Sequence, residues 1–512
     1  MILKYAALLT AALFAALAAA LASLLSKRGS SIPQVLRKPL ATTDPAEAEQ
    51  ILRKEAASRR PVVFEQAAIP LSWAALSQWQ PWRLANLPTI PQICAREESP
   101  VFVWEDPARP LGRNLGMRVR SGHGFERNAS ASGFFSSLQQ QPGLQQQQGP
   151  YRYLSAKLHH EPYATHLASH LEPRAFLSAP ADLAEFRGQD ANLFAGAAGT
   201  LAHTHYDPTH GIFAQVVGTK RFELWAPECW LELRLHPHAH PGHRQSQLLP
   251  TAGLGPHPVA QLEAVLGPGD LLYVPPFWFH RVTSLSFSTG VSVATDSHEG
   301  ARFDAACRAG LPAELRDTRT PLESRARAAQ RFLLGGLLRL AKPEGPAEYA
   351  QRALVEARFA PLATELLSAR GSLRRGEPRA AVGADEPAAT AAAAATGAAA
   401  ATGAADPEEW CAAPCEVARD GGGATAEELR LATAVLSAIR GEAGRQRRDQ
   451  TAALRLDAVG SIVLEDYIEH VASFVVGDAQ LLPFLQGCLA ARPPPEGEDG
   501  ESCASVAHVP FG

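Results

Sequence analysis

Short runs of β-forming residues, separated by proline and glycine, fill the chain from residue 60 to about residue 296. Residues 61–64 read Pro-Val-Val-Phe, and two longer runs, residues 212–217 and 220–225, flank the pair Gly218-Thr219. Such runs predict strands, and we expect Gly218-Thr219 to form the hairpin turn that joins the last two. The pattern predicts a mainly β domain over residues 60–300.

Helical spacing of apolar residues replaces this pattern further along the chain. Residues 301–370 carry it, best over 325–340 and 347–367, and residues 426–490 predict a second, small helical unit. Between them, residues 371–425 are rich in alanine, glycine and threonine, which favours a flexible linker. Residues 491–512 are expected to be a loose tail.

The N-terminus is apolar from residue 6 to residue 25, apart from Thr10 and Ser23, and Lys27-Arg28 follow it. About 20 apolar residues suffice to cross a bilayer as a helix. Residues 1–28 therefore predict a signal anchor or a cleaved signal peptide, and with it a membrane-anchored or secretory-lumen location. Because no acidic residue precedes Asp44, an organelle transit peptide remains the alternative.

Composition narrows the choice of protein class. Charged residues make up 20% of the chain and the formal net charge is −4, which excludes a basic nucleic-acid-coating protein; we expect no nucleic-acid partner. Seven cysteines in 512 residues do not make a disulfide scaffold. In a lumenal chain Cys411 could pair with Cys415, and Cys488 with Cys503. The other cysteines are expected to be unpaired: Cys94, Cys229 and Cys307.

Two residues suggest a metal site. His205 and Asp207 are two positions apart in a predicted strand, so their side chains share a face. An imidazole beside a carboxylate supplies two of the three ligands of a non-haem Fe(II) centre. His280, 75 residues later and just after Pro275-Pro276, is the candidate for the third ligand. Antiparallel strands of a jelly roll can bring such positions together.

Lys220 offers an independent sign of a bound anion. It alternates with Phe222 and Leu224, so one orientation places the ammonium group on an apolar, inward face. A buried ammonium is costly unless it meets an anion, such as a dicarboxylate. The opposite orientation would make Lys220 an ordinary surface charge beside Arg221 and Glu223.

These motifs together resemble those of the JmjC (Jumonji-C, cupin-like) 2-oxoglutarate oxygenases. The resemblance rests on His205-x-Asp207, on Phe-Ala-Gln-Val-x-Gly-x-Lys-Arg ending at Arg221, and on Pro-Gly-Asp-x-x-x-x-Pro-Pro-x-Trp-x-His ending at His280. It is greatest for the asparaginyl-hydroxylase type known as factor inhibiting HIF. It covers residues 200–295 well and 60–160 loosely. It implies a double-stranded β-helix (jelly-roll, cupin) core, with the hydrophobic N-terminal segment and the helical C-terminal region as additions.

The resemblance also implies roles for residues. His205, Asp207 and His280 match the iron ligands, Lys220 matches the lysine that binds the far carboxylate of 2-oxoglutarate, and Tyr153 resembles a tyrosine that touches this cosubstrate. Fe(II), 2-oxoglutarate and O2 are the implied cofactor and cosubstrates.

Two positions depart from the family pattern. Ala202 stands where the family often has a threonine, for which Thr204 is the candidate substitute. Thr295 stands where the hydroxylase subgroup has an asparagine. Both threonines are candidate cosubstrate-binding residues, and the departures bear on cosubstrate affinity more than on iron binding.

The expected activity is hydroxylation of a protein side chain or demethylation of N-methyl lysine, with a protein or peptide as substrate. The alternative is a non-catalytic cupin-fold protein that binds metal or mediates an interaction. The helices after residue 301 are expected to cap the barrel or to form a homodimer.

A run of histidines at residues 236, 238, 240 and 243 suggests a second metal site. Pro237 and Pro241 favour instead an extended loop, which we expect to be a solvated insertion between strands.

Overall fold

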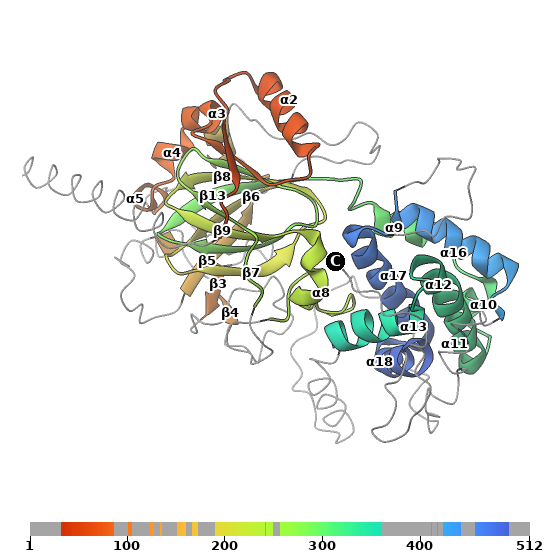
Figure 1. Cartoon of the computed structure of the whole chain (residues 1–512). Coiled ribbons are helices and arrows are strands. Elements are labelled where there is room, and N and C mark those ends of the chain that lie inside the picture. The colour runs from red at the N-terminus through yellow and green to blue at the C-terminus, as the bar shows by residue number, and fades with distance from the viewer. Residues whose placement is uncertain are drawn as a thin grey trace, which may run out of the picture.

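The computed structural model describes residues 32–85, 101–104, 123–126, 134–135, 151–159, 166–172, 190–240, 242–248, 257–359, 411, 417, 423–441 and 456–490. Two β-sheets face each other (Figure 1). The larger sheet has nine strands, in the order β1 (Leu36–Pro39), β2 (Val62–Glu65), β11 (Leu271–Val274), β8 (His210–Val217), β13 (Ser288–Thr295), β6 (Asp190–Gly196), β5 (Tyr151–Lys157), β3 (Val101–Trp104) and β4 (His123–Glu126). The smaller sheet has four, in the order β10 (Leu262–Leu266), β9 (Lys220–Trp225), β12 (Phe279–Ser284) and β7 (Leu201–Tyr206).

Alternation along the strands builds three hydrophobic cores from these sheets. On β11, Leu272 lies in the core between the sheets, whereas Leu271 lies in a second core on the outer face of the large sheet. On the small sheet, Leu224 faces the other sheet, whereas Trp225 lies in a third core on the outer side. Successive side chains of a strand point to opposite faces, which explains this division.

Helices cover both outer faces. Against the large sheet pack four helices close to the N-terminus of the described chain: α2 (Pro45–Ala56), α3 (Ala68–Ser72), α4 (Ala75–Gln78) and α5 (Pro81–Leu84). Asp44 begins α2, because its carboxylate accepts a hydrogen bond from the Ala46 N–H at 3.0 Å. The two facing sheets confirm the predicted jelly-roll core, and these four helices form the layer that covers its large sheet.

The outer face of the small sheet packs against the C-terminal helical region. Its elements are α9 (Arg302–Arg308), α10 (Ala313–Arg316), α11 (Leu322–Gln330), η4 (Arg331–Leu338), α12 (Arg339–Ala341), α13 (Pro346–Tyr349), η5 (Ala350–Phe359), α16 (Ala426–Ile439), α17 (Ala458–Val476), η10 (Asp478–Gln480), α18 (Leu481–Phe484) and η11 (Leu485–Leu489). The helices before and after the predicted linker share one hydrophobic core, which also contains Trp225 and Phe279 of the sheet. The helical C-terminal region is thus confirmed as part of the fold. The boundaries predicted between its units stay a prediction.

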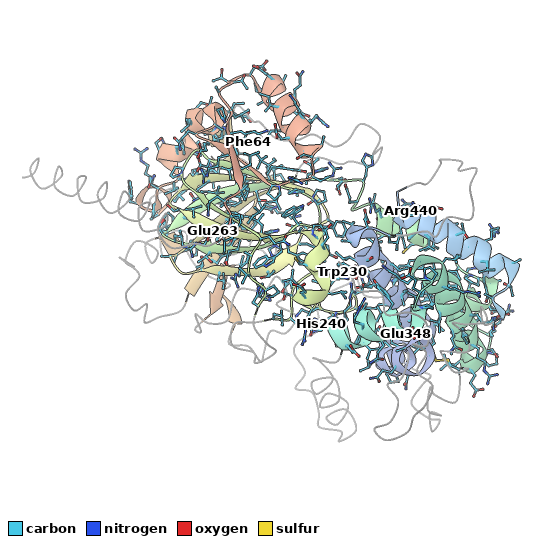
Figure 2. All side chains as sticks on the ribbon, viewed as in Figure 1. Phe64, Trp230, His240, Glu263, Glu348 and Arg440 are labelled. Carbon is cyan, nitrogen blue, oxygen red and sulfur yellow. A yellow bond between two sulfur atoms is a disulfide. The ribbon has the colours of Figure 1, made fainter. Side chains whose placement is uncertain are left out.

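A short segment links the two layers. After β9 the chain forms η3 (Pro227–Cys229) and α8 (Trp230–Leu233), which lie between the sheet and α17 (Figure 1). Trp230, labelled in Figure 2, donates a hydrogen bond from Nε1 to Glu465 Oε1 of α17 at 2.9 Å.

The hairpin predicted at Gly218-Thr219 is wrong. Strand β8 pairs with β11 and β13 in the large sheet, whereas β9 pairs with β10 and β12 in the small one. The chain therefore crosses from one sheet to the other at this turn. Gly218 has φ +75°, and a Cβ there would lie 1.8 Å from the Phe287 carbonyl oxygen, so the corner requires glycine.

The disulfide differs from both predicted pairs. Cys411 is bonded to Cys488, which lies in η11, so at least one point of the predicted flexible linker is fixed to the helical region. Cys229 and Cys307 are free, as expected. Cys94, Cys415 and Cys503 lie outside the described residues.

The hydrophobic segment 1–28 also lies outside the described residues. Within the part of the chain that the structure describes, no single helix has the length and hydropathy needed to cross a membrane. One pair of helices meets the criteria only when taken together, Ala458–Val476 with Asp478–Leu489, and it is bent by 110°.

Candidate functional site

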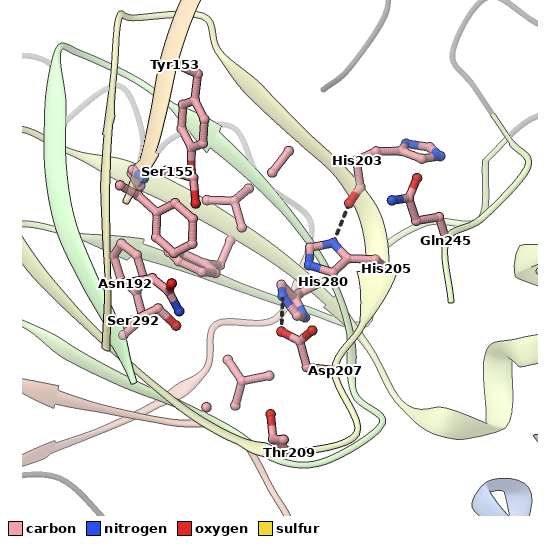
Figure 3. A pocket seen from close by; sticks show the side chains of 18 residues that line it. Tyr153, Ser155, Asn192, His203, His205, Asp207, Thr209, Gln245, His280 and Ser292 are labelled. Carbon is pink, nitrogen blue, oxygen red and sulfur yellow. Dashed lines mark hydrogen bonds and ion pairs between the residues drawn. The ribbon is translucent and has the colours of Figure 1, made fainter. Parts of the chain in front are cut away.

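A cavity of about 240 Å³ opens between the two sheets. It is smaller than the roughly 300–1,000 Å³ of sites for drug-sized ligands, so it suits a small molecule. Tyr153 lies toward one end of the cavity, and His205, Asp207 and His280 lie toward the other (Figure 3). Lys220 also lines the cavity, with its Nζ 5.6 Å from the ring centre of Tyr153.

Two neighbouring strands bring the three candidate ligands together. His205 lies on β7 and Asp207 directly follows that strand, whereas His280 lies on β12 and is paired with His205 across the sheet. One donor atom from each residue falls within 4.8 Å of the other two. His280 Nε2 is 3.9 Å from Asp207 Oδ2, and the two imidazole rings are 4.2 Å apart between centres.

Hydrogen bonds to the backbone fix both imidazoles in the same tautomer. The Nδ1–H of His205 donates to the His203 carbonyl oxygen at 2.6 Å, and that of His280 donates to the Trp278 carbonyl oxygen at 3.1 Å. A carbonyl oxygen can only accept, so each Nδ1 carries a proton, and Nε2 is the ring nitrogen of each histidine that can bind a metal. Metal-binding histidines are commonly oriented in this way. Two neutral imidazoles and one carboxylate fit Fe(II), with coordination positions left open for other ligands.

Of the two orientations that the sequence left open for Lys220, the structure shows the inward one, since the residue is only 2% exposed. Burial lowers the pKa of its ammonium group to about 7. Among the described residues it has no carboxylate partner. Its Nζ lies instead 5.0 Å from the ring centre of Phe213, 5.6 Å from that of Tyr153 and 5.8 Å from that of Phe194. Aromatic faces attract a cation only weakly, and they do not neutralise its charge as an anion would. The ammonium group is thus placed to receive an anionic ligand.

Tyr153 lies on β5 and lines the cavity beside Lys220. It is paired across the sheet with Gly196 of β6, and a Cβ at that glycine would lie 2.7 Å from the Tyr153 ring. The glycine therefore leaves room for the tyrosine ring in this position.

The structure does not bring Thr204 or Thr295 into the cavity. Thr204 neighbours His205 on β7 and so points to the other face, where its Oγ1 hydrogen-bonds His257 Nε2 at 2.9 Å. Thr295 is buried at the end of β13, paired with His210. Neither is placed to touch a ligand there. Ala202 does line the cavity.

Several polar residues that line the cavity were not predicted from the sequence: Ser155, Asn192, Thr209, Gln245 and Ser292. Asn192 and Ser292 are paired across β6 and β13. Both residues place a polar side chain in an otherwise apolar strand, and this pattern is the signal by which the sequence could have identified them.

The histidine-rich segment is not the solvated insertion that its prolines predict. His236 is partly buried, and this burial lowers its pKa to about 3. Its ring stacks on that of His240 at 4.3 Å between centres, and the His238 N–H donates to Glu469 Oε2 of α17 at 2.6 Å. The helix that covers this segment comes more than 200 residues later in the chain. The contact could therefore not be predicted from the residues around the histidines.

Comparison with known proteins agrees with the geometry. Residues 48–297 match the family model described as a cupin-like domain. Over 109 residues the chain is 38% identical to Jumonji C domain-containing protein 5 of Drosophila melanogaster, a match that covers 20% of this chain and 27% of the relative. Residues 48–297 form a cupin-like JmjC domain.

Two further relatives match the chain over stretches of similar length. One is the lysine-specific demethylase JMJ30 of Arabidopsis thaliana, 34% identical over 110 residues, which are 20% of this chain and 25% of the relative. The other is tRNA wybutosine-synthesizing protein 5 of Danio rerio, 40% identical over 95 residues, which are 18% of this chain and 28% of the relative. The aligned part thus spans about a quarter of each relative's length.

Among solved structures, the ribosomal oxygenase YcfD of Escherichia coli matches with a TM-score of 0.26 and 16% identity, over 49% of this chain and 52% of that chain. That score is too low for a comparison residue by residue. The predicted resemblance to JmjC proteins is confirmed. The finer resemblance to the factor-inhibiting-HIF type stays a prediction.

Proposed function

We propose that the chain is an Fe(II)- and 2-oxoglutarate-dependent dioxygenase that oxidises a protein side chain. The observation that carries the proposal is the content of one cavity: two imidazoles and a carboxylate at one end, and a buried ammonium group without a carboxylate partner among the described residues at the other. A dicarboxylate with a keto acid at one end matches both ends of such a cavity.

Each residue then has a defined task. His205, Asp207 and His280 would hold Fe(II), with the imidazoles already oriented by the carbonyls of residues 203 and 278. Lys220 would hold the far carboxylate of 2-oxoglutarate, and the Tyr153 ring beside it would exclude water. With iron bound, the centre would couple the oxidation of 2-oxoglutarate by O2 to succinate and CO2 with insertion of the second oxygen atom into a substrate C–H bond.

The choice of substrate class follows from the names of the relatives and from the charge of the chain. The relatives' names divide between lysine demethylases and tRNA wybutosine-synthesizing proteins. The net charge of −4 offers no general attraction to the phosphates of an RNA, which favours a protein. Hydroxylation of a side chain and demethylation of N-methyl lysine both begin at a C–H bond, so the same centre serves either reaction.

The proposal is tested by incubating the purified chain with Fe(II), O2 and 2-oxoglutarate and measuring succinate. Wild type should form succinate, and Asp207→Ala should form none. His159→Ala is the matched control, because His159 is exposed and lies outside the cavity. Tight iron binding without any succinate, with methyl-lysine peptides or tRNA added in turn, would favour the non-catalytic cupin protein instead.

We also propose that residues 1–28 bring the chain to a membrane or into the secretory lumen. The support is the Cys411–Cys488 disulfide, because disulfides persist mainly in oxidising compartments. Protease protection of the tagged chain in sealed membrane vesicles tests this. Full digestion without detergent would contradict it.

A further inference from the structure

A second group of potential ligands lies outside the oxygenase cavity, where the histidine-rich segment meets α17. His238, His243 and Asp466 each direct one donor atom to a common point. His238 Nδ1 is 3.3 Å from His243 Nε2, His243 Nε2 is 3.1 Å from Asp466 Oδ2, and His238 Nδ1 is 3.9 Å from Asp466 Oδ2.

These separations match those of a metal centre. The point equidistant from the three atoms lies about 2 Å from each, which is the bond length of Zn²⁺ to nitrogen and oxygen ligands. Without a metal, neutral imidazoles leave His243 Nε2 two arrangements: it shares one proton between His238 Nδ1 and Asp466 Oδ2, or it accepts from His238 Nδ1–H and faces the carboxylate oxygen lone pair to lone pair. Three convergent lone-pair donors are better satisfied by one cation.

The charge around α17 favours a cation at this point. Glu465, Asp466 and Glu469 are buried, and the buried guanidinium of Arg358 reaches all three, with N–O distances of 3.0, 2.7 and 2.7 Å. Among the described lysines and arginines, Arg358 alone pairs directly with these three carboxylates. The ammonium group of Lys342 is attracted to Glu465 but hydrogen-bonds Ser461 instead.

The ligands are already held in place. Arg358 Nη1 donates to Asp466 Oδ1, which leaves Oδ2 directed at the imidazoles. The loop is closed by backbone hydrogen bonds from the His240 N–H to the Pro237 carbonyl and from the His243 N–H to the His240 carbonyl, at 3.0 and 2.8 Å. The side chains of His238 and His243 are 23% and 27% exposed, so a metal ion and a water ligand can reach them.

We infer that His238, His243 and Asp466 bind a zinc ion that fastens the JmjC domain to the C-terminal helical region. Imidazole and carboxylate ligands with one open position suit Zn²⁺. The loop leads directly into Gln245, which lines the oxygenase cavity and is bridged to His205. Zinc at this site would therefore stiffen one wall of that cavity without taking part in its chemistry.

The test uses the full chain with His205→Ala and Asp207→Ala, so that the oxygenase cavity no longer holds metal. After dialysis against buffered Zn²⁺, this variant should retain one zinc per chain by atomic emission. Adding His243→Ala should weaken zinc binding by about 100-fold or more, since even residues that only orient zinc ligands change affinity by 10- to 100-fold. Adding the exposed His159→Ala instead should leave zinc binding unchanged.

Less than a tenth of a zinc per chain in the double variant, or zinc retained after His243→Ala, would overturn the inference. If His243→Ala does not fold, the double variant is loaded with Co²⁺. A four-coordinate visible spectrum supports the site, and its absence overturns it. Because the oxygenase ligands are removed throughout, the result is independent of the proposed function.

Discussion

The ammonium nitrogen of Lys220 lies 5.0 Å from the ring centre of Phe213, deep between the two sheets. An aromatic face compensates only part of the cost of burying a charge. The unliganded protein therefore holds Lys220 at the expense of stability, and an anionic ligand would recover that free energy.

The first prediction concerns Lys220→Met, which removes the charge and keeps an unbranched side chain that is one atom shorter. Without 2-oxoglutarate it should raise the free energy of unfolding by about 1–3 kcal/mol. Affinity for 2-oxoglutarate should fall roughly 10- to 100-fold, the equivalent of one charge-assisted hydrogen bond. Urea unfolding and calorimetric titration measure the two effects. A variant that is less stable and still binds 2-oxoglutarate normally would show that the lysine has another role.

The second prediction follows from the Lys220 pKa, which is about 7 in the folded protein and 10.5 in the unfolded chain. Between these values the unfolded chain binds more protons, so the contribution of Lys220 to the stability of the unliganded protein rises with pH. Binding of 2-oxoglutarate requires the charged form and should take up a proton above pH 7. Calorimetry at pH 8 in buffers of different ionisation enthalpy measures this uptake. It should disappear in Lys220→Arg, whose guanidinium stays charged; equal uptake in both proteins would contradict the assignment.

The third prediction concerns Arg358, the cation shared by three carboxylates of α17. Arg358→Ala leaves those charges buried and should lower the free energy of unfolding by about 3–5 kcal/mol. Arg352→Ala, at an exposed position of the same helical segment, is the control and should change it by less than about 0.5 kcal/mol. Chemical denaturation compares the two. Similar stabilities would mean that the carboxylates find other partners or are protonated.

The fourth prediction concerns the disulfide between Cys411 and Cys488, which are 77 residues apart. Cys411→Ser should lower the free energy of unfolding by about 2–4 kcal/mol, because the unfolded chain loses a constraint on a long loop. A reductant should destabilise wild type by a similar amount and leave the variant unchanged. If the reductant acts equally on both proteins, the bond is absent in solution.

The spacing of residues within one strand predicted which side chains share a face of the sheet. The positions of His205 and Asp207 two residues apart implied a shared face because side chains alternate along a strand, and the structure shows both lining one cavity. The same alternation explains why Thr204 lies outside it. For Lys220, alternation left two orientations open, and only the packing of the second sheet decides between them.

Apart from the contact of His280 with His205, which the resemblance to JmjC proteins implied, contacts between distant segments could not be predicted from the sequence. Gly218-Thr219 marks a reversal of the chain, but glycine in a turn does not say whether the flanking strands pair with each other or join different sheets. His243 meets Asp466 across 223 residues of sequence, and Cys411 meets Cys488 across 77. The first contact depends on how the helical region packs against the histidine-rich segment, and the second depends on the fold of the helical region itself; no local pattern encodes either.

The most direct test of the central claim is anaerobic titration of the full chain with 2-oxoglutarate in the presence and absence of Fe(II), followed by calorimetry. We predict one 2-oxoglutarate per chain, with iron required for tight binding, and loss of that binding in Asp207→Ala. Wild type that binds no 2-oxoglutarate with iron present, or that binds it equally well without iron and in Asp207→Ala, would contradict the account.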